Sequence, residues 1–423
     1  MLFSFTIGNY RSFSGNKTLS LEPAAISEYR HNIISRGRYD FLTTAVIYGA
    51  NSSGKTNLLR GLEVMKRIVD KNFESSSVGE IPYDPYLLNT RTAEEPSFYE
   101  VLFLAEGVKY RYGFTADKHS VLSEWLFCTE KRSEKPLFIR VPEGIEVMRG
   151  FPEGKGLEEK TRDNALFLSV ADQFNGPVSA QIMAWFRDFN IISGLGHNNY
   201  RRLIYSMLEH PSTASMLNDF FRSIDLGFEE IRLEKRDLTP EELSGEIPEN
   251  MINNLVSETG TRRLVSLRST HRVFNDEQQI TGEAQFDVRR RESSGTNKIV
   301  DLSGPVFDTL LSGGVLGVDE LDASLHPLLT LSLVKLFQNP EINKKGAQLI
   351  FSTHDTNLLS ICELRRDQIY FVEKDRAGAS DLYSLVEYDR DGKVRKDRSF
   401  EKDYINGRYG AIPYFGEFDK LMY

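Results

Sequence analysis

The sequence predicts an α/β fold with an antiparallel β lobe at the N-terminus, a core of mostly parallel strands flanked by helices, and a helical insertion. Three patterns predict it. Apolar and polar residues alternate over residues 1–22 around the turn Ser14-Gly15-Asn16, as in a β-hairpin. The alternation returns over residues 98–128, as in an antiparallel meander. From residue 299 onward, short apolar runs alternate with helically spaced segments, which is typical of a parallel sheet.

The C-terminal pattern can be divided into six elements. Helices are expected over residues 298–311, 327–338 and 355–361, and strands over 314–319, 347–352 and 368–373. Residues 200–225 also have helical spacing, whereas residues 227–260 are rich in Glu and predict a mobile or poorly packed segment. A chain of 423 residues exceeds the size of one efficient core. We therefore predict an N-terminal lobe (1–175), a mainly helical insertion (176–262) and a C-terminal lobe (263–423).

Composition narrows the class of protein. No run of eighteen apolar residues occurs, and the alternating N-terminus predicts a strand and not a signal peptide, so no membrane association is expected. Two cysteines, Cys128 and Cys362, make no disulfide framework, which favours a cytoplasmic location. The net charge of −9 does not favour general DNA binding. Three short basic runs are interpreted as solvated faces, although they could line a local groove: Arg201-Arg202, Arg289-Arg290-Arg291 and Lys393 to Arg398.

A phosphate-binding loop is predicted between the apolar run Phe41 to Tyr48 and a helically spaced segment that starts after Lys55. Strand, glycine-containing loop and helix direct backbone N–H groups and the positive helix end toward one point, which favours a phosphate. Lys55 is expected to reach the β- and γ-phosphates of ATP, and the Thr56 hydroxyl to bind Mg²⁺. The predicted nucleotide-binding residues of this segment are Gly49, Asn51, Ser52, Ser53, Gly54, Lys55, Thr56 and Asn57.

A second predicted part of the site is a pair of acids at the end of the apolar run Val315 to Val318. Asp319 would hold Mg²⁺ through water, and Glu320 would act as the general base on the attacking water. Many strands end in solvated carboxylates, so the acid pair alone does not indicate a metal site. It does so here because the predicted phosphate-binding loop lies upstream in the same chain. Together the two motifs predict ATP binding and hydrolysis with Mg²⁺.

The residues that follow the acids indicate the class of ATPase. Leu321 to Pro327 leads from the acids into a helix, and His354 follows the next predicted strand. In ABC-type ATPases the acid pair is followed by a D-loop and then by a switch histidine that touches the γ-phosphate. Asp322 and His354 match these two places, although a histidine at a strand end is otherwise commonly structural.

A signature loop is predicted at Glu292 to Thr296, just before the helix that leads to the acid pair. Ser293, Ser294 and Gly295 could offer hydroxyl and N–H donors to the γ-phosphate held by another subunit. The same residues would also make an ordinary helix cap, and this alternative stays open.

With these motifs assembled, the chain resembles the RecF/SMC-like branch of the ABC-type ATPases. It looks most like the compact prokaryotic ATPases of phage-defence and abortive-infection operons, such as the RloA, AbiL and PARIS-type ATPases. Besides the motifs above, the resemblance rests on five segments: Asn9 to Phe13, Tyr110 to Phe114, Leu166 to Ser169, Arg365 to Ile369 and Gly407 to Pro413. It implies an ABC-type P-loop head, a homodimer or higher oligomer closed by ATP at the nucleotide sites, and an effector protein encoded in the same operon.

Two further residues receive roles from the resemblance alone. Arg11 matches the basic residue that lies beside the nucleotide, and Gln173 is the candidate for the Q-loop glutamine at the metal. Arg11 could instead be a surface residue of a hairpin, and Gln173 could cap a helix.

Two alternatives to a defence ATPase need to be considered, of which the first stays open. A RecF-like DNA-repair or DNA-end-binding ATPase would use the basic runs, but the long coiled coil of SMC proteins is absent from the sequence. The overcoming-lysogenization nucleases carry a Toprim domain after a similar head, and Ile369 to Asp375 with Asp389-Arg390-Asp391 imitates its acids superficially. The 50 residues after Glu373 are too few for a domain of roughly 100 residues. A hairpin turn explains Asp389 to Asp391 better.

Overall fold

The computed structural model describes residues 1–71, 76, 78–129, 133–194, 200–237, 255–258, 261–388 and 399–413. The chain divides into two compact units, which are described separately. Unit 1 contains Met1–Ser193, Thr309–Asp322 and Leu333–Tyr423, and unit 2 contains Gly194–Asp308 and Ala323–Ser332. Lys393 to Arg398 and Asp389 to Asp391 lie outside the described residues.

The N-terminal lobe of unit 1 is a seven-stranded antiparallel sheet in the order β10-β9-β8-β7-β6-β1-β2. The predicted hairpin and meander are both in this sheet and are confirmed. Successive residues of β6 alternate between buried and half-buried positions because they face opposite sides of the sheet, which explains the period of two in the sequence. The strands are β1 (Leu2–Gly8), β2 (Lys17–Ser20), β6 (Ser97–Ala105), β7 (Val108–Ala116), β8 (Val121–Thr129), β9 (Lys135–Val141) and β10 (Gly144–Val147).

The second sheet of unit 1 has six strands in the order β11-β16-β17-β5-β18-β19, and all neighbours are parallel except β18 and β19. Its central strands β5 and β17 are buried at every position, which explains their continuous apolar runs. This confirms the predicted α/β fold with a mostly parallel core. The strands are β5 (Thr44–Tyr48), β11 (Phe189–Ser193), β16 (Val315–Asp319), β17 (Gln348–Ser352), β18 (Ile369–Lys374) and β19 (Ser380–Ser384).

Helix α1 (Lys55–Lys71) packs between the two sheets of unit 1. Gly61 makes the contact with β1 possible, since a Cβ there would lie 2.0 Å from Cδ1 of Ile7. On its other side, α1 meets β16, where a Cβ on Gly317 would come within 3.6 Å of a methyl group of Leu59. The apolar residues of the helix are buried in this core while Arg60, Glu63 and Arg67 stay exposed, and this packing positions the N-terminus of the helix at the end of β5.

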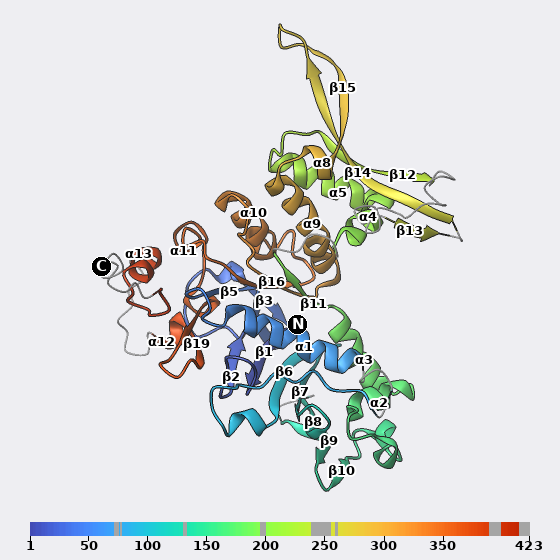
Figure 1. The fold of residues 1–423 in the computed structure, drawn as a ribbon, viewed down its shortest axis with the longest axis vertical. Helices are drawn as coiled ribbons and strands as arrows, with labels where there is room; N and C mark the ends of the chain where they lie inside the picture. The colour runs from blue at the N-terminus through green and yellow to red at the C-terminus, as the bar shows by residue number, and fades with distance from the viewer. Residues whose placement is uncertain are drawn as a thin grey trace, which may run out of the picture. The chain divides into compact units, whose positions relative to one another are not determined.

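The remaining elements of unit 1 cover the sheets. Figure 1 shows α2 (Phe167–Gln173) and α3 (Pro177–Arg187) beside the antiparallel lobe, and α12 (Leu385–Tyr388) close to β19. The other elements are β3 (Ile33–Arg36), β4 (Tyr39–Leu42), α11 (Leu358–Ile361), α13 (Phe400–Ile405) and the 3-10 turns η1 (Arg30–Asn32), η3 (Thr92–Glu94), η4 (Pro152–Gly154), η5 (Glu158–Lys160) and η6 (Arg366–Gln368).

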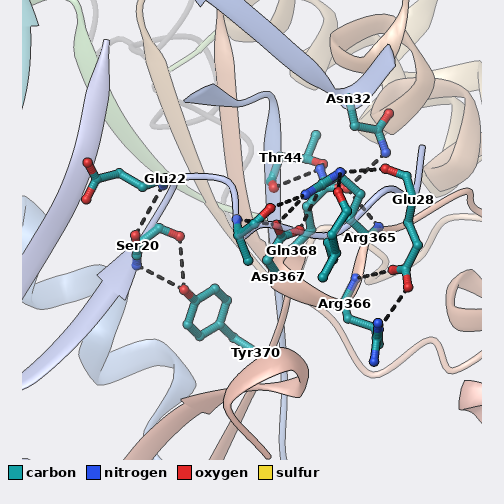
Figure 2. Close-up of polar contacts among 12 residues, drawn as sticks. Ser20, Glu22, Glu28, Asn32, Thr44, Arg365, Arg366, Asp367, Gln368 and Tyr370 are labelled. Carbon is teal, nitrogen blue, oxygen red and sulfur yellow. Dashed lines mark hydrogen bonds and ion pairs between the residues drawn. The ribbon is translucent and has the colours of Figure 1, made fainter. Parts of the chain in front are cut away.

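A buried polar cluster at Arg365 to Gln368 fixes the segment that precedes β5 (Figure 2). Arg365 is fully buried, and its Nε and Nη2 donate to the two carboxylate oxygens of Asp367 at 2.9 and 2.7 Å. The guanidinium also donates to the backbone carbonyls of Ala24, Ile26 and Glu28. Gln368 connects the same segment to the core, because Asn32 donates to its Oε1 and its Nε2 donates to Thr44 at the start of β5.

Unit 2 contains helices and a four-stranded antiparallel sheet of β12, β13, β14 and β15. Two of its helices, α4 (Arg201–Glu209) and α5 (Pro211–Ser223), confirm the predicted helical spacing of residues 200–225. The strands are β12 (Glu230–Asp237), β13 (Leu255–Glu258), β14 (Thr261–Phe274) and β15 (Ile280–Asp287). Helix α8 (Val288–Arg291) and most of α9 (Ser294–Ser312) follow, and α10 (Pro327–Gln338) begins in this unit.

The inserted unit differs from the predicted mainly helical insertion over residues 176–262. Residues 176–193 form α3 and β11 of unit 1, and unit 2 extends to Asp308. The expectation of a poorly packed segment is wrong for β12, which pairs with β14 over its whole length. Beyond Leu233 its residues are exposed, so charged side chains are tolerated there and the sequence lacks the apolar pattern of a strand. Residues 238–254 of that segment lie outside the described residues.

Candidate nucleotide site

The site is built at the carboxyl ends of three neighbouring parallel strands of unit 1. In the sheet order, β17 lies between β16 and β5, and all three run in the same direction. The loop Gly49 to Gly54 follows β5, the acids stand at the end of β16, and His354 follows β17. The parallel topology therefore brings together three motifs that are far apart in the sequence, at the edge where α/β proteins bind ligands.

The loop between β5 and α1 is clamped by two serines that the sequence analysis missed. Ser380 donates from its backbone N–H to the carbonyl of Ser12 at 2.6 Å, and its Oγ donates to the carbonyl of Ser53 at 2.5 Å. A Cβ on Gly54 would lie 2.3 Å from Oγ of Ser380 and 2.8 Å from Oγ of Ser12, at a φ of +121°. Glycine is thus required at position 54 both for conformation and for space.

Lys55 folds back over its own loop. Its Nζ donates to the carbonyl of Gly49 at 2.7 Å and to that of Ala50 at 3.1 Å, and the residue is buried. Burial lowers the pKa of the Lys55 amine, while the negative charges of Asp319, Glu320 and Asp322 act in the opposite direction. The Lys55 amine therefore interacts electrostatically with all three carboxylates at and after the end of β16. This arrangement is typical of a site shared by phosphates and a metal ion.

Ser352 positions both acids of the predicted pair. Its hydroxyl donates to Oδ1 of Asp319 at 2.6 Å and accepts the backbone N–H of Glu320 at 2.8 Å. Glu320 has a φ of +55°, a conformation that is uncommon outside glycine. The fully buried Ser352 thus holds the backbone turn at Glu320. Sequence reasoning missed Ser352, although the pairing of Phe351 with Val318 places it opposite Asp319.

His354 lies on the loop after β17, where its backbone N–H is 3.3 Å from Oδ2 of Asp322. Desolvation lowers the pKa of the imidazole and the charge of Lys55 lowers it further, while Asp322, Glu320 and Asp319 oppose the shift. His354 and Lys55 therefore act on each other electrostatically in the same site. A lowered pKa favours the neutral imidazole, which can donate or accept a single hydrogen bond at neutral pH.

The residues present fit Mg–ATP. Oγ of Ser53 is buried and makes no hydrogen bond within the described part of the chain, so a polar atom of the loop is left for a ligand. A Cβ on Gly49 would lie 2.3 Å from the carbonyl of Val372 and 2.6 Å from this Oγ, so the loop needs glycine there as well. Thr56 stands in the first turn of α1, and Asp319 lies at the end of β16. Their oxygens are the kind of ligand that Mg²⁺ prefers.

Arg11 and Asn57 lie together beside the loop. Arg11 donates from Nε to Oδ2 of Asp84 at 2.6 Å, and its Nη1 is 3.5 Å from Oδ1 of Asn57. Asn57 in turn donates to Oγ of Ser12 at 2.9 Å. The guanidinium is therefore held next to the first turn of α1, the place implied by the resemblance, whereas Asn51 and Ser52 are exposed at the outer part of the loop.

Gln173 is not brought to the site, which contradicts its predicted role as a metal ligand. It is the exposed last residue of α2, and Ser169 in the same helix donates from Oγ to the carbonyl of Val69. Val69 is near the C-terminal end of α1, 14 residues beyond Lys55. At 1.5 Å per residue, the contact is about 20 Å from the start of that helix. The packing of α2 on the far end of α1 could not be read from the sequence.

The predicted signature residues lie in unit 2, at the start of α9. Oγ of Ser293 accepts the backbone N–H of Thr296 at 3.0 Å, so the helix-cap interpretation is confirmed for this hydroxyl. Ser294 is exposed, and a Cβ on Gly295 would lie 3.1 Å from the carbonyl of Ser324. A cap hydroxyl can exchange partners, so a role of Ser293, Ser294 and Gly295 toward a second copy stays a prediction.

Ser352→Ala should weaken the use of Mg²⁺ without preventing folding. The change removes the donor to Asp319 and the acceptor for Glu320, and loss of such supporting contacts typically costs about 10–100-fold in metal affinity or activity. The measurement is the ATP hydrolysis rate as Mg²⁺ is titrated. Ser360→Ala is the matched control, because its hydroxyl is exposed on α11. Identical Mg²⁺ titrations for both variants would contradict the positioning role of Ser352.

No helix in the described ranges is both long and apolar enough to cross a membrane.

Comparison with curated proteins gives no significant match. Two solved structures are similar at low identity. The SMC head domain from Thermotoga maritima is 13% identical with a TM-score of 0.39, and the match covers 90% of this chain and 98% of that one. A crystal structure of an SMC head bound to the C-winged helix domain of ScpA is 16% identical with a TM-score of 0.42, covering 90% and 97%.

A family model described as an AAA domain, putative AbiEii toxin of a type IV toxin–antitoxin system, matches residues 45–360. The matched range begins in β5 and ends after His354, so it contains the phosphate loop, the predicted signature, the acid pair and the histidine. This range is most of the chain and agrees with the ATPase domain that the motifs predict. The chain therefore belongs to this family of AAA-type ATPase domains.

Proposed function

We propose that the chain binds Mg–ATP at Gly49 to Thr56 and hydrolyses it with Glu320 as general base. The observation that carries the proposal is the parallel order of β16, β17 and β5, which brings the loop with Lys55, the acids Asp319 and Glu320, and His354 to one edge of the sheet. A lysine beside carboxylates at this edge suits a ligand that brings phosphates and a metal ion. Lys55 would contact the phosphates, Thr56 and Asp319 would hold Mg²⁺, and His354 would stand at the γ-phosphate.

The proposal includes a dimer closed by ATP. In it, Ser293, Ser294 and Gly295 of a second copy would complete each nucleotide site, as the resemblance to ABC-type ATPases implies. The hydroxyls and N–H groups at the start of α9 support this role, because the N-terminus of a helix favours a phosphate. Sedimentation with and without Mg–ATP tests it, and a chain that stays monomeric on ATP in the Glu320→Gln variant contradicts it.

The biological role that we propose is the sensor and regulatory ATPase of an anti-phage defence system that controls a separately encoded effector. The family description, with its toxin–antitoxin system, supports a role in such operons. The test is a phage challenge of cells that carry this gene with its neighbours. Protection that survives Lys55→Ala, or the absence of a complex with the neighbouring gene product in every nucleotide state, would argue against this role.

Lys55→Ala should weaken ATP binding by about 10–100-fold, since hydrogen bonds to charged groups contribute about 1.5–3 kcal/mol. The measurement is calorimetric titration with Mg–ATP, with a thermal melt to show that the variant is folded. Lys118→Ala is the control, because that lysine is half exposed and pairs with Glu80 on the surface. If both variants bind Mg–ATP with the parental affinity, the nucleotide does not use Lys55.

A further inference from the structure

A cavity of about 440 Å³ in unit 2 has five arginines in its lining. It is formed by α4, β12, β14, the end of β15 and α8, all within the same unit. This volume is within the range of small-molecule sites, roughly 300–1,000 Å³. The arginines of the lining are Arg201, Arg236, Arg268, Arg289 and Arg290.

The charge of this arginine cavity favours an anion. Five arginines line it against two carboxylates, Glu234 and Asp287. Arg268 donates to Glu234 at 2.7 Å, and Asp287 accepts the backbone N–H of Arg290 as the cap of α8. With Asp301, which pairs with Arg201 at 2.7 Å, three carboxylates stand against the five arginines, so the local charge stays positive. Arg289 and Arg290 belong to a run that the sequence analysis interpreted as a solvated face, but both contribute to the cavity wall.

The cavity is connected to the predicted signature by hydrogen bonds. Arg201, which is buried, donates to Asp301 at 2.7 Å and to Asn297 at 3.1 Å, and both residues belong to α9. Asn297 in turn donates to the carbonyls of Val288 and Glu292 at 3.0 and 3.1 Å. These contacts join α4, α8 and the start of α9 around the segment that holds Ser293 to Gly295. A ligand that binds the arginines would therefore affect the same hydrogen bonds that hold the start of α9, where the predicted signature residues lie.

We propose that the arginine cavity binds a compact phosphorylated ligand, about the size of a nucleotide, and that the bound ligand stiffens the start of α9. Guanidinium groups bind phosphate oxygens through paired hydrogen bonds, and a cluster of them selects a multiply charged phosphate ligand. The binding is independent of the ATPase proposed above. Its consequence for the signature rests on that proposal.

The test uses inorganic pyrophosphate as the probe and the full chain saturated with Mg–AMPPNP, so that the phosphate loop is occupied. Calorimetry should show one pyrophosphate site, which Arg289→Gln/Arg290→Gln weakens at least about tenfold, because each arginine supplies charge-assisted hydrogen bonds. The control Arg222→Gln/Arg272→Gln removes the same charge from exposed positions of unit 2 and should stay within about twofold of the parent. Hydrogen exchange of residues 292–301 should slow when pyrophosphate binds.

Three results would overturn the proposal: no pyrophosphate binding to the parent, equal binding by both double variants, or binding without slower exchange at residues 292–301. A single-stranded oligonucleotide of about 20 nucleotides serves as the second binding probe. If the strand depends on Arg289 and Arg290 with a steep salt dependence while pyrophosphate does not compete, the surface binds nucleic acid and the compact ligand is wrong. A chain that does not bind AMPPNP contradicts the ATPase instead, and the variants still test the cavity.

Discussion

Glu320→Gln should slow ATP hydrolysis by about 10²–10⁴-fold, the usual effect of losing a general base, while ATP binding is retained. Glutamine keeps the size of the side chain and tolerates the φ of +55° about as well as glutamate. The backbone N–H of residue 320 would still donate to Ser352, so the turn after β16 is preserved. The loss of rate then reports the carboxylate itself and no change of the fold.

The measurement is single-turnover hydrolysis, together with sedimentation on Mg–ATP. The variant should accumulate as an ATP-bound dimer, because it completes the site but cannot leave the bound state by hydrolysis. Glu341→Gln serves as the control, since that glutamate is exposed in the turn after α10. Hydrolysis by Glu320→Gln at the parental rate would remove Glu320 from the mechanism and leave the base unassigned.

Arg365→Met should destabilise unit 1 by about 3–5 kcal/mol, the usual cost of removing one partner of a buried ion pair. The change removes two donors from the buried carboxylate of Asp367, which keeps the backbone N–H of Ala24. It also removes the donors to the carbonyls of Ala24, Ile26 and Glu28 (Figure 2). Methionine fills most of the volume, so the loss comes from unpaired polar groups and not from a cavity.

Urea unfolding followed by tryptophan fluorescence can measure this effect, since the two tryptophans of the chain, Trp125 and Trp185, both belong to unit 1. Arg91→Met is the matched control, because the Arg91 side chain is 78% exposed and should contribute less than about 1 kcal/mol. Adding Asp367→Leu to Arg365→Met should recover part of the loss, because it removes the orphaned charge. A midpoint within experimental error of the parent would show that the cluster does not stabilise unit 1.

The central part of the fold and of the site follows from local patterns. The apolar strand, glycine loop and helix around Lys55 form a contiguous unit, so their geometry depends on neighbouring residues. The strand that ends in Asp319 and Glu320 is equally local. By contrast, Ser380 and Ser12 clamp the loop from distant parts of the chain, and nothing in their surroundings marks them for this role.

The misplaced predictions share a physical reason. Gln173 follows a segment with the right order along the chain, but α2 packs on the far end of α1, and this depends on which apolar faces meet in three dimensions. The strand β12 is charged because half of it faces solvent, so its pairing with β14 decides its conformation and its own composition does not. The arginines that line the cavity of unit 2 come from four separate elements, α4, β12, β14 and α8, and no one of these segments by itself predicts a binding site.

The sequence by itself determined the local motifs: a glycine loop between a strand and a helix, an acid pair at a strand end and a histidine, each encoded by a few consecutive residues whose backbone conformation is local. The tertiary structure decided how these motifs are supported. The strand order places β17 between β16 and β5, so Ser352 can hold Asp319 and Glu320 beside Lys55. Ser352 is 33 positions from Asp319, and Ser380 is 327 positions from Ser53, so such contacts depend on packing that no single segment encodes.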